Sequence, residues 1–396
     1  MPLGHGGFAD DRAPRDAVVA VPVPPGLEPA DGEVHEAAGL RWVLGASLLE
    51  ARQRAGKVQG RRTTVGDRPP IPLPDLPAGG VRLATGWVEP AYLEPDASWC
   101  EPGGDPASPL ANGGAFGGKE SSPAPPAARE LADRLGRAVR VVLAREDVVR
   151  LGPKRPPMAG AAVLRDATVS LSGAVARGGL PAFLAPVDLP YALKLDERWD
   201  PVDLRGPEVS GALRASGLAE RALLVEGALD AAGVDRGALV VDDRAATVLL
   251  DTCAGAPGGA RAGARVHLDP GSGRLQRVEV RVAAGDPLDE VVLRGFAVGA
   301  SHMALGWVLT EGIAVDPETG EVHDLTIRSF GVLRAADTPP IEVQIVDDPG
   351  PPRPRSSDAV FAAVASATWN ALARVEGERP EALPARDTRT GRAPRR

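Results

Sequence analysis

The feature that most constrains this chain is a glycine-rich stretch, Asn112–Glu120, that runs directly into a helical pattern. It reads Asn-Gly-Gly-Ala-Phe-Gly-Gly-Lys-Glu, so four glycines surround Phe116. Glycine adopts positive φ without strain and lets backbone N–H groups approach a bound group closely. A helix that begins after such a turn adds unpaired N–H donors and the positive end of its dipole. The stretch therefore predicts either a backbone site for an anionic or oxo ligand, or a mobile surface loop.

Length and hydropathy indicate a soluble, multidomain protein. The chain has 396 residues, of which 43% are hydrophobic, and its mean hydropathy is −0.09. A chain of this length has room for two or three domains with their own cores. No apolar run approaches the roughly 20 residues needed to span a bilayer, and the N-terminus lacks the pattern of a secretory signal. We therefore predict a cytoplasmic protein with no membrane partner.

Charge and cysteine content exclude other classes of function. The net charge is −8 at pH 7, which argues against a nucleic-acid partner. The chain has only two cysteines, Cys100 and Cys253. Two thiols exclude a disulfide framework, and they exclude an iron–sulfur cluster, which needs about four cysteine ligands. Both are predicted to be buried small apolar residues.

Hydrophobic periodicity, together with the glycines and prolines that interrupt it, predicts the helices and strands. In residues 1–38 the prolines around a short valine run predict one edge strand followed by coil. Leu40–Arg54 has apolar residues at helical spacing and predicts a helix, whereas the five prolines between residues 64 and 80 predict an extended linker. Further strands are expected at 81–98 (a pair), 137–145, 161–176, 266–273, 275–283, and 313–315 with 322–327. Further helices are expected at 126–135, 212–232, 287–312 and 359–375.

Four stretches, in chain order, resemble one family. They are Ala91-Tyr92-Leu93-Glu94-Pro95, the glycine-rich stretch, Val141–Glu146 and Ala335–Val343. Together they are similar to the molybdopterin-binding large subunit of the xanthine dehydrogenase/aldehyde oxidase family of molybdenum hydroxylases. The resemblance implies an α+β fold of mixed sheets with packed helices. It further implies a first molybdopterin-binding-like domain at 81–235 and a contracted second one at 236–376. These follow an N-terminal segment with its linker at 1–80 and precede a disordered basic tail at 377–396.

The resemblance also implies site residues. Gly114, Phe116, Gly117 and Gly118 match the loop that the family sets against the oxo ligand of its molybdenum. Arg205 matches an arginine that points toward the substrate, although a residue before Gly206-Pro207 is equally a turn residue. Asp358 aligns with the glutamate that serves the family as a base, and it is equally explained as a helix N-cap.

Several family features are missing, which makes the chain a shortened and partly degenerate relative. The pterin-gripping Gly-Gln-Gly loop is absent, and only some thirty residues separate Asp235 from Arg265. Leu293-Arg294-Gly295-Phe296 stands where the family has a glutamine that touches the pterin. A phenylalanine ring cannot make those hydrogen bonds.

Two functions follow as alternatives. The first is a subunit of a molybdenum hydroxylase, which hydroxylates an aldehyde or N-heterocycle with water as the oxygen source. It would use the molybdenum cofactor and pass electrons to separate iron–sulfur and FAD subunits. The second is a non-catalytic structural or assembly paralogue that pairs with a full-length molybdenum subunit. Between them lies a split site completed by another chain. His302 and His323 lack neighbours at metal-ligand spacing and are predicted to be structural.

Overall fold

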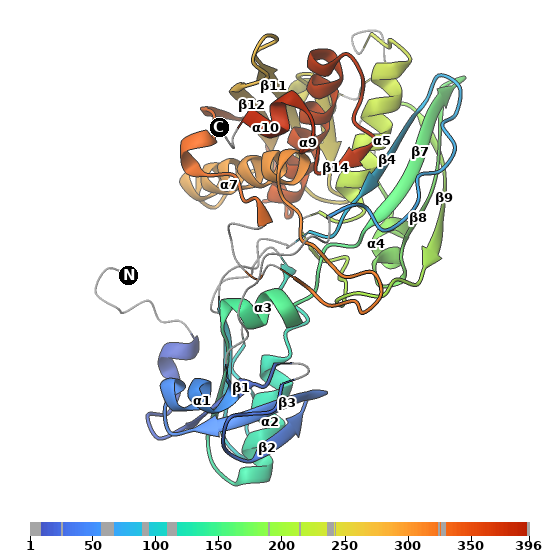
Figure 1. Cartoon of the computed structure of the whole chain (residues 1–396). Helices are drawn as coiled ribbons and strands as arrows, with labels where there is room; N and C mark the ends of the chain where they lie inside the picture. Colours follow the sequence, from blue (N-terminus) through green and yellow to red (C-terminus); the bar gives the residue numbers. More distant parts are fainter. Residues whose placement is uncertain are drawn as a thin grey trace. The chain divides into compact units, whose positions relative to one another are not determined.

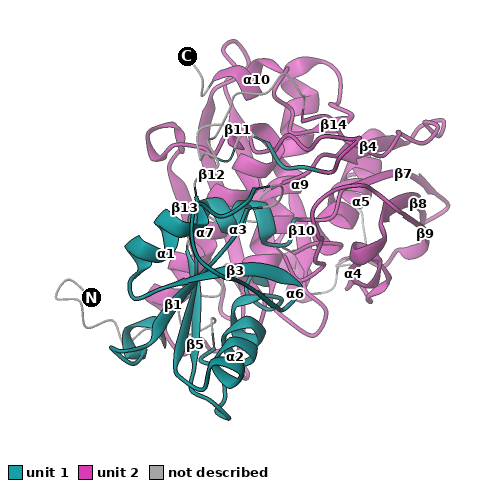
Figure 2. Ribbon diagram, turned by 60° about the horizontal axis from the view of Figure 1, so that its bottom comes forward, with its two compact units in different colours: residues 1–64, 89–154, 321–326 teal, residues 65–88, 155–320, 327–396 magenta. Residues whose placement is uncertain are grey.

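The computed structural model describes residues 9–24, 27–56, 67–88, 95–108, 117–188, 191–213, 215–235, 241, 243–323, 325 and 330–393. The chain has mixed sheets with packed helices, so the predicted α+β class is confirmed. It forms two compact units, shown in teal and magenta in Figure 2. Unit 1 contains residues 1–64, 89–154 and 321–326, and unit 2 contains 65–88, 155–320 and 327–396. The units are interleaved along the chain, unlike the sequential domains that we predicted.

Unit 1 is built on a five-stranded sheet in the order β2-β3-β1-β6-β5. β1 and β6 are parallel, and the other neighbours are antiparallel. The strands are β1 (Val18–Pro22), β2 (Val34–Ala37), β3 (Leu40–Gly45), β5 (Asp96–Cys100) and β6 (Val139–Leu143). The short helices η1 (Ala9–Arg12) and α3 (Arg145–Leu151) complete the unit together with α1 and α2.

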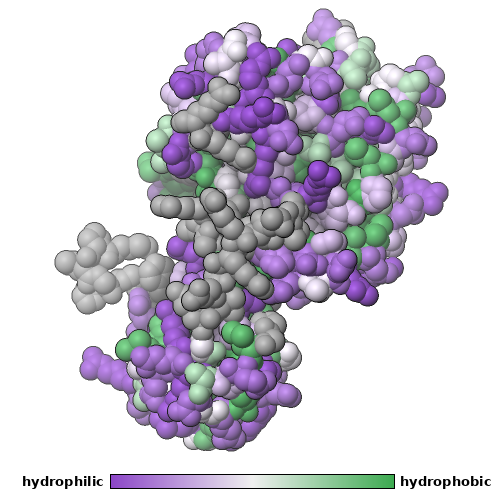
Figure 3. Space-filling model, in the orientation of Figure 1, coloured by the Kyte–Doolittle hydropathy of each residue, from purple (hydrophilic) through white to green (hydrophobic). Residues whose placement is uncertain are grey.

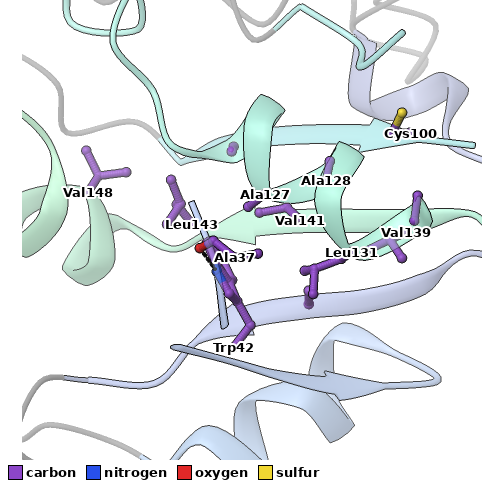
Figure 4. Packing of buried hydrophobic residues seen from close by; sticks show 13 residues of the cluster. Ala37, Trp42, Cys100, Ala127, Ala128, Leu131, Val139, Val141, Leu143 and Val148 are labelled. Carbon is purple, nitrogen blue, oxygen red and sulfur yellow. Dashed lines mark hydrogen bonds between the residues drawn. The ribbon is translucent and has the colours of Figure 1, made fainter. Parts of the chain in front are cut away.

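Each face of this sheet is covered by one helix. α2 (Ala124–Leu135) packs Leu131 and four buried alanines against Trp42, Val139 and Val141 on one face, as Figure 4 shows. The Trp42 indole is fully buried and donates to the Ala37 carbonyl at 2.9 Å, the dashed line in Figure 4. α1 (Leu48–Ala55) packs Ala51 and Ala55 against the valines of the other face.

Two predictions for this region are wrong. β1 is an internal strand between β3 and β6, not an edge strand, because its prolines fall at the strand end where no ladder bond is lost. The predicted helix over Leu40–Arg54 is a strand followed by a shorter helix. The break is Gly45–Ser47: a Cβ on Gly45 would lie 2.4 Å from the Ala51 nitrogen, and Ser47 caps α1 by accepting from Glu50 N at 3.2 Å.

Unit 2 contains two sheets. One has the order β14-β4-β7-β8-β9 and the other β10-β11-β12-β13. The first sheet's strands are β4 (Val81–Thr85), β7 (Met158–Arg165), β8 (Thr168–Ala176), β9 (Lys194–Val202) and β14 (Ala382–Leu383). The second sheet's strands are β10 (Thr252–Gly255), β11 (Arg261–Leu268), β12 (Leu275–Ala283) and β13 (Ile341–Ile345).

Three long helices join these sheets into one core. They are α5 (Leu218–Ala231), α7 (Glu290–Leu309) and α9 (Ser356–Glu376). α5 packs on the β4–β7 side, α9 packs on β10 and β11, and α5 and α7 both pack on α9 (Figure 1). Every residue of α9 from Ala359 to Leu372 is buried, which is the pattern of a helix enclosed on all sides. Shorter helices are η4 (Arg177–Gly179), α4 (Leu180–Leu184), α6 (Asp243–Val248), η5 (Ala335–Asp337) and α10 (Arg389–Arg392).

Several predicted elements match the structure closely. α2 ends at Gly136 in the left-handed conformation (φ 65°), as the glycine predicted. β11 and β12 form the predicted antiparallel pair, and α5, α7 and α9 occupy three predicted helical segments.

The predicted strand pair at 81–98 is wrong, because β4 and β5 belong to different sheets in different units. The predicted hairpin around Asp316–Gly320 keeps its turn, with Gly320 N donating to Asp316 O at 2.8 Å. The described residues on either side of that turn form no strand.

Two stretches differ from what composition indicated. By length and composition alone, α7 is long and apolar enough to cross a membrane. However, 56% of its most apolar part is buried inside the protein. Residues 377–393, for which we predicted a disordered tail, form β14 and α10. Arg386 explains the order of this tail, because its guanidinium donates to the carbonyls of Thr310, Gly312 and Phe330.

The α2 face of the unit 1 sheet yields a stability prediction. Replacing the fully buried Leu131 with alanine leaves a cavity beside Trp42 and should lower the free energy of unfolding by about 2–5 kcal/mol. The matched control is Arg134→Ala on the exposed face of the same helix, which should have little effect. Urea denaturation of both variants measures the difference. Equal midpoints for the two variants would contradict this packing.

Candidate functional site

The end of the glycine-rich stretch lies in unit 1, directly before α2. Gly114 and Phe116 lie outside the described residues, so their predicted roles stay predictions. Gly117 has φ of 91°, a left-handed conformation that favours glycine. Its carbonyl accepts from Glu120 N at 3.2 Å, which closes a tight turn through the buried Gly118 and Lys119. The described end of the stretch is thus a tight turn, and the predicted ligand-binding role of Gly117 and Gly118 stays a prediction.

A buried pair fixes this turn to the sheet. Asp96 on β5 is fully buried, and its Oδ2 accepts from Ser122 Oγ at 2.5 Å. Its Oδ1 accepts from Ala97 N at 2.8 Å. Ser122 Oγ in turn accepts from Ala124 N at 3.1 Å, the first residue of α2. The carboxylate therefore sets where α2 begins and where the glycine-rich stretch ends.

Arg205 lies in unit 2, on the exposed segment after β9. Its Nη1 donates to the Glu318 carbonyl at 2.7 Å. The next residue, Gly206, contacts Trp87 so closely that a Cβ there would lie 2.5 Å from the indole ring. Gly320 also lies so close to the Gly206 backbone that a Cβ on Gly320 would collide with it. Arg205 thus ties its own segment to the Asp316–Gly320 turn, which agrees with the turn-residue alternative.

Asp358 also lies in unit 2 but in a different neighbourhood. α9 begins at Ser356, and its N-cap is Arg355 in the left-handed conformation (φ 62°). The prediction that Asp358 is the N-cap is therefore wrong. Asp358 is half-buried in the first turn of α9, where a carboxylate is favoured by the helix dipole. The chain just before this turn contacts the β10–β11 turn, since Ala260 N donates to Pro354 O at 2.9 Å.

The predicted site residues thus belong to two different units. Gly117 and Gly118 belong to unit 1, whereas Arg205 and Asp358 belong to unit 2 and contact different segments there. Within the described part of the chain, no group of three or more His, Cys, Asp or Glu residues could hold a metal ion. His302 Nδ1 lies 2.9 Å from Thr338 Oγ1. Cys100 and Cys253 are buried, as predicted, and burial raises the pKa of the Cys100 thiol.

The most enclosed charges in unit 2 form an ion pair that sequence analysis missed. Arg155 Nε donates to Glu220 Oε1 at 2.8 Å, and the two side chains are 1% and 0% exposed. The guanidinium carbon lies 4.2 Å from the Trp307 ring centroid and 5.2 Å from that of Phe361. Glu220 Oε2 also accepts from Gly217 N at 2.8 Å at the start of α5. This cluster joins α5, α7 and α9, and its burial marks it as structural.

The outer face of α7 was also missed, and it is the largest run of exposed apolar side chains on one helix in the described residues. Val291, Val292 and Phe296 on α7 are 80%, 50% and 54% exposed, and Leu288, just before the helix, is 94% exposed. Gly295 and Gly299 lie beside them, and a Cβ on either would meet nothing within 4 Å. We call these six residues the α7 outer face. Figure 3 shows hydrophobic surface at the edge of unit 2 where Figure 1 places α7.

The sequence resemblance aligned Phe296 of this face with a pterin-contacting glutamine, and that alignment stays a prediction. The side chains around it offer no hydrogen-bonding group to a polar heterocycle: the i−4 neighbour is Val292, and the flanking glycines have no side chain. The described side chains of the α7 outer face therefore supply no hydrogen bond of their own to a polar ligand.

Solved structures with the same fold were found, at low sequence identity. Quinoline 2-oxidoreductase from Pseudomonas putida 86 has a TM-score of 0.64 at 11% identity, covering 97% of this chain and 95% of that chain. Aldehyde oxidoreductase from Desulfovibrio gigas has a TM-score of 0.61 at 11% identity, and the match covers 87% of this chain and 68% of that chain. The Cu,Mo-CO dehydrogenase has a TM-score of 0.53 at 10% identity, and the match covers 76% of this chain and 74% of that chain. No family model and no curated protein matches the sequence. The chain therefore has the fold of molybdenum hydroxylase subunits, as predicted.

Breaking the buried ion pair between Arg155 and Glu220 should destabilise the protein. Arg155→Met leaves the Glu220 carboxylate buried without its partner and should lower the free energy of unfolding by about 3–5 kcal/mol. The double variant Arg155→Met/Glu220→Gln should recover part of this loss, because no unpaired charge remains. Thermal and urea denaturation measure both variants.

The matched control is Arg177→Met, which breaks an exposed pair with Asp203 whose side chains are 60% and 77% exposed. Its stability should be unchanged within error, because exposed pairs contribute little. An Arg155→Met variant as stable as this control would show that the buried pair does not hold the helices.

Proposed function

We propose that the chain is a subunit of a molybdenum-hydroxylase-type oxidoreductase complex and that it serves there as a non-catalytic partner of a molybdenum-carrying subunit. The fold supports membership of such a complex, since the likeness extends over 97% of the chain in one case. The α7 outer face carries the non-catalytic part of the proposal. It presents valines and a phenylalanine where a cofactor would need hydrogen-bond partners.

The same face supports a protein partner. Exposed apolar side chains that gather on one surface are typical of protein–protein contacts, and aromatic residues are enriched at the centre of such contacts. Leu288, Val291, Val292 and Phe296 form such a patch, and the bare glycines beside them let a second backbone approach closely. The partner that we propose for this face is the molybdenum subunit of the same complex, with iron–sulfur and FAD subunits carrying the electrons onward. The location that we propose for the complex is the cytoplasm.

A catalytic role is the second candidate, and one observation favours it. Gly117 has the left-handed conformation that suits a glycine-rich binding loop, and the turn is held in place by Asp96 and Ser122. In that case Gly114, Phe116, Gly117 and Gly118 would lie against the cofactor. Arg205 would orient the substrate, and Asp358 would act as the base. Arg205 would have to give up its contact with the Glu318 carbonyl.

Metal content separates the two candidates. The purified chain alone should contain molybdenum far below one equivalent, and the metal should appear only when the partner subunit is co-purified. In that complex, Asp358→Asn should leave the turnover of aldehydes and N-heterocycles unchanged. Stoichiometric molybdenum in the lone chain, or loss of turnover in a folded Asp358→Asn complex, would establish the catalytic role instead.

The subunit contact is tested at Phe296. Phe296→Asp places a charge in the centre of the α7 outer face and should weaken co-purification with the molybdenum subunit at least about tenfold, since a buried unpaired charge is costly. The matched control is Leu76→Asp, because Leu76 is 52% exposed and Phe296 is 54% exposed. Quantitative pull-down compares them. If both variants retain the partner equally, the contact lies elsewhere.

A further inference from the structure

Unit 1 contains a cavity that neither the glycine-rich stretch nor the proposed function accounts for. It has a volume of about 430 Å³, within the roughly 300–1,000 Å³ that small-molecule sites occupy. Its lining comes from the carboxyl ends of the parallel strands β1 and β6 and from α1 and α3. Crevices at the carboxyl ends of neighbouring parallel strands are a recurrent place for ligands.

The walls of the cavity are of two kinds. Pro22, Pro24 and Leu49 form an apolar side, and Leu49 is 68% exposed. Arg52 and Gln53 from the end of α1 face Glu146, Asp147 and Arg150 from α3 across the opening. A ligand with an apolar body and one polar end would match both sides.

Arg150 is half-buried in the lining of the cavity, and one of its guanidinium nitrogens, the buried Nη1, makes no hydrogen bond among the described residues. Burial also lowers the pKa of its guanidinium, against the attraction of Asp147, Glu146 and Glu321. A buried N–H without an acceptor destabilises the protein. The planar guanidinium fork pairs best with a carboxylate, which accepts two parallel hydrogen bonds.

Asp147 sets how much negative charge the cavity accepts. Burial raises the pKa of its carboxyl to about 6, although Arg150 and Arg52 lower it. Its Oδ2 also accepts from Ala144 N at 2.8 Å. The lining carries two arginines and two acids, so one added negative charge is balanced when Asp147 takes up a proton. A dianion such as phosphate would leave a second charge unbalanced.

We propose that this cavity binds a small organic monocarboxylate, with its carboxylate on the guanidinium of Arg150 and its apolar body against Leu49 and the two prolines. The cavity belongs to unit 1 and the α7 outer face to unit 2, and this proposal does not rest on the proposed subunit role. It assigns unit 1 a ligand-binding activity of its own.

Isothermal titration of the full chain with sodium benzoate tests the proposal, and benzamide serves as the uncharged analogue of the same shape. Benzoate should bind at least about tenfold more tightly than benzamide and than inorganic phosphate. Arg150→Gln should weaken benzoate about tenfold or more, whereas Arg134→Gln, on the exposed face of α2, should not change it. Arg52→Gln, at an exposed position, provides a second variant should Arg150→Gln fail to fold, and it should weaken benzoate about threefold.

The pH dependence provides an independent readout. Because bound benzoate favours the protonated Asp147, affinity should fall as pH rises through about 6, and Asp147→Asn should flatten this dependence between about pH 5 and about pH 8. The groups that face Asp147 are Arg150 and Glu146 on α3 and Arg52 on α1. Equal binding of benzoate and benzamide, tighter binding of phosphate, or full affinity in both arginine variants would overturn the proposal.

Discussion

The interaction on which unit 2 depends is the buried ion pair between Arg155 and Glu220. Two charges removed from water are costly unless nearly all their hydrogen-bonding capacity is used. Here the guanidinium meets a carboxylate, the Leu213 carbonyl and two aromatic rings at once. Because those rings come from α7 and α9 and the carboxylate from α5, the pair specifies how three helices meet. Gly227 supports the same junction, since a Cβ there would lie 2.5 Å from the Trp369 ring.

This fixed junction holds α7 by one face and leaves its other face without a packing role in the core. The inner face of α7 packs Leu293, Ala297 and Ala304 into the core, and Trp307 lies on Arg155. The outer face contributes nothing to that core, so its residues are free to suit a ligand or a partner. Here they are apolar, with Phe296 among them. A helix held so firmly on one side presents its other side as a rigid surface, which is what a subunit contact requires.

Local signals predicted the elements whose ends are set by local chemistry. Gly136 predicted the end of α2, and the Asp269–Gly273 turn predicted the β11–β12 pair. Sequence reasoning failed where distant residues decide. Arg155 and Glu220 are 65 positions apart and carry no motif, and residues 65–88 leave unit 1 so that β4 can pair with β7. The start of α9 was also missed, because Arg355 and not Asp358 takes the cap position. One signal for the α7 outer face was present but unused: Gly295 and Gly299 stand four apart beside Val292 and Phe296.

The central claim is that the α7 outer face contacts protein and not a cofactor. An electron cryomicroscopy structure of the chain bound to its co-purified molybdenum subunit tests this most directly. The account predicts that Val292 and Phe296 are covered by the partner's polypeptide and that the pterin is held entirely by the partner. A pterin in contact with Phe296 or with Asp358 would contradict it.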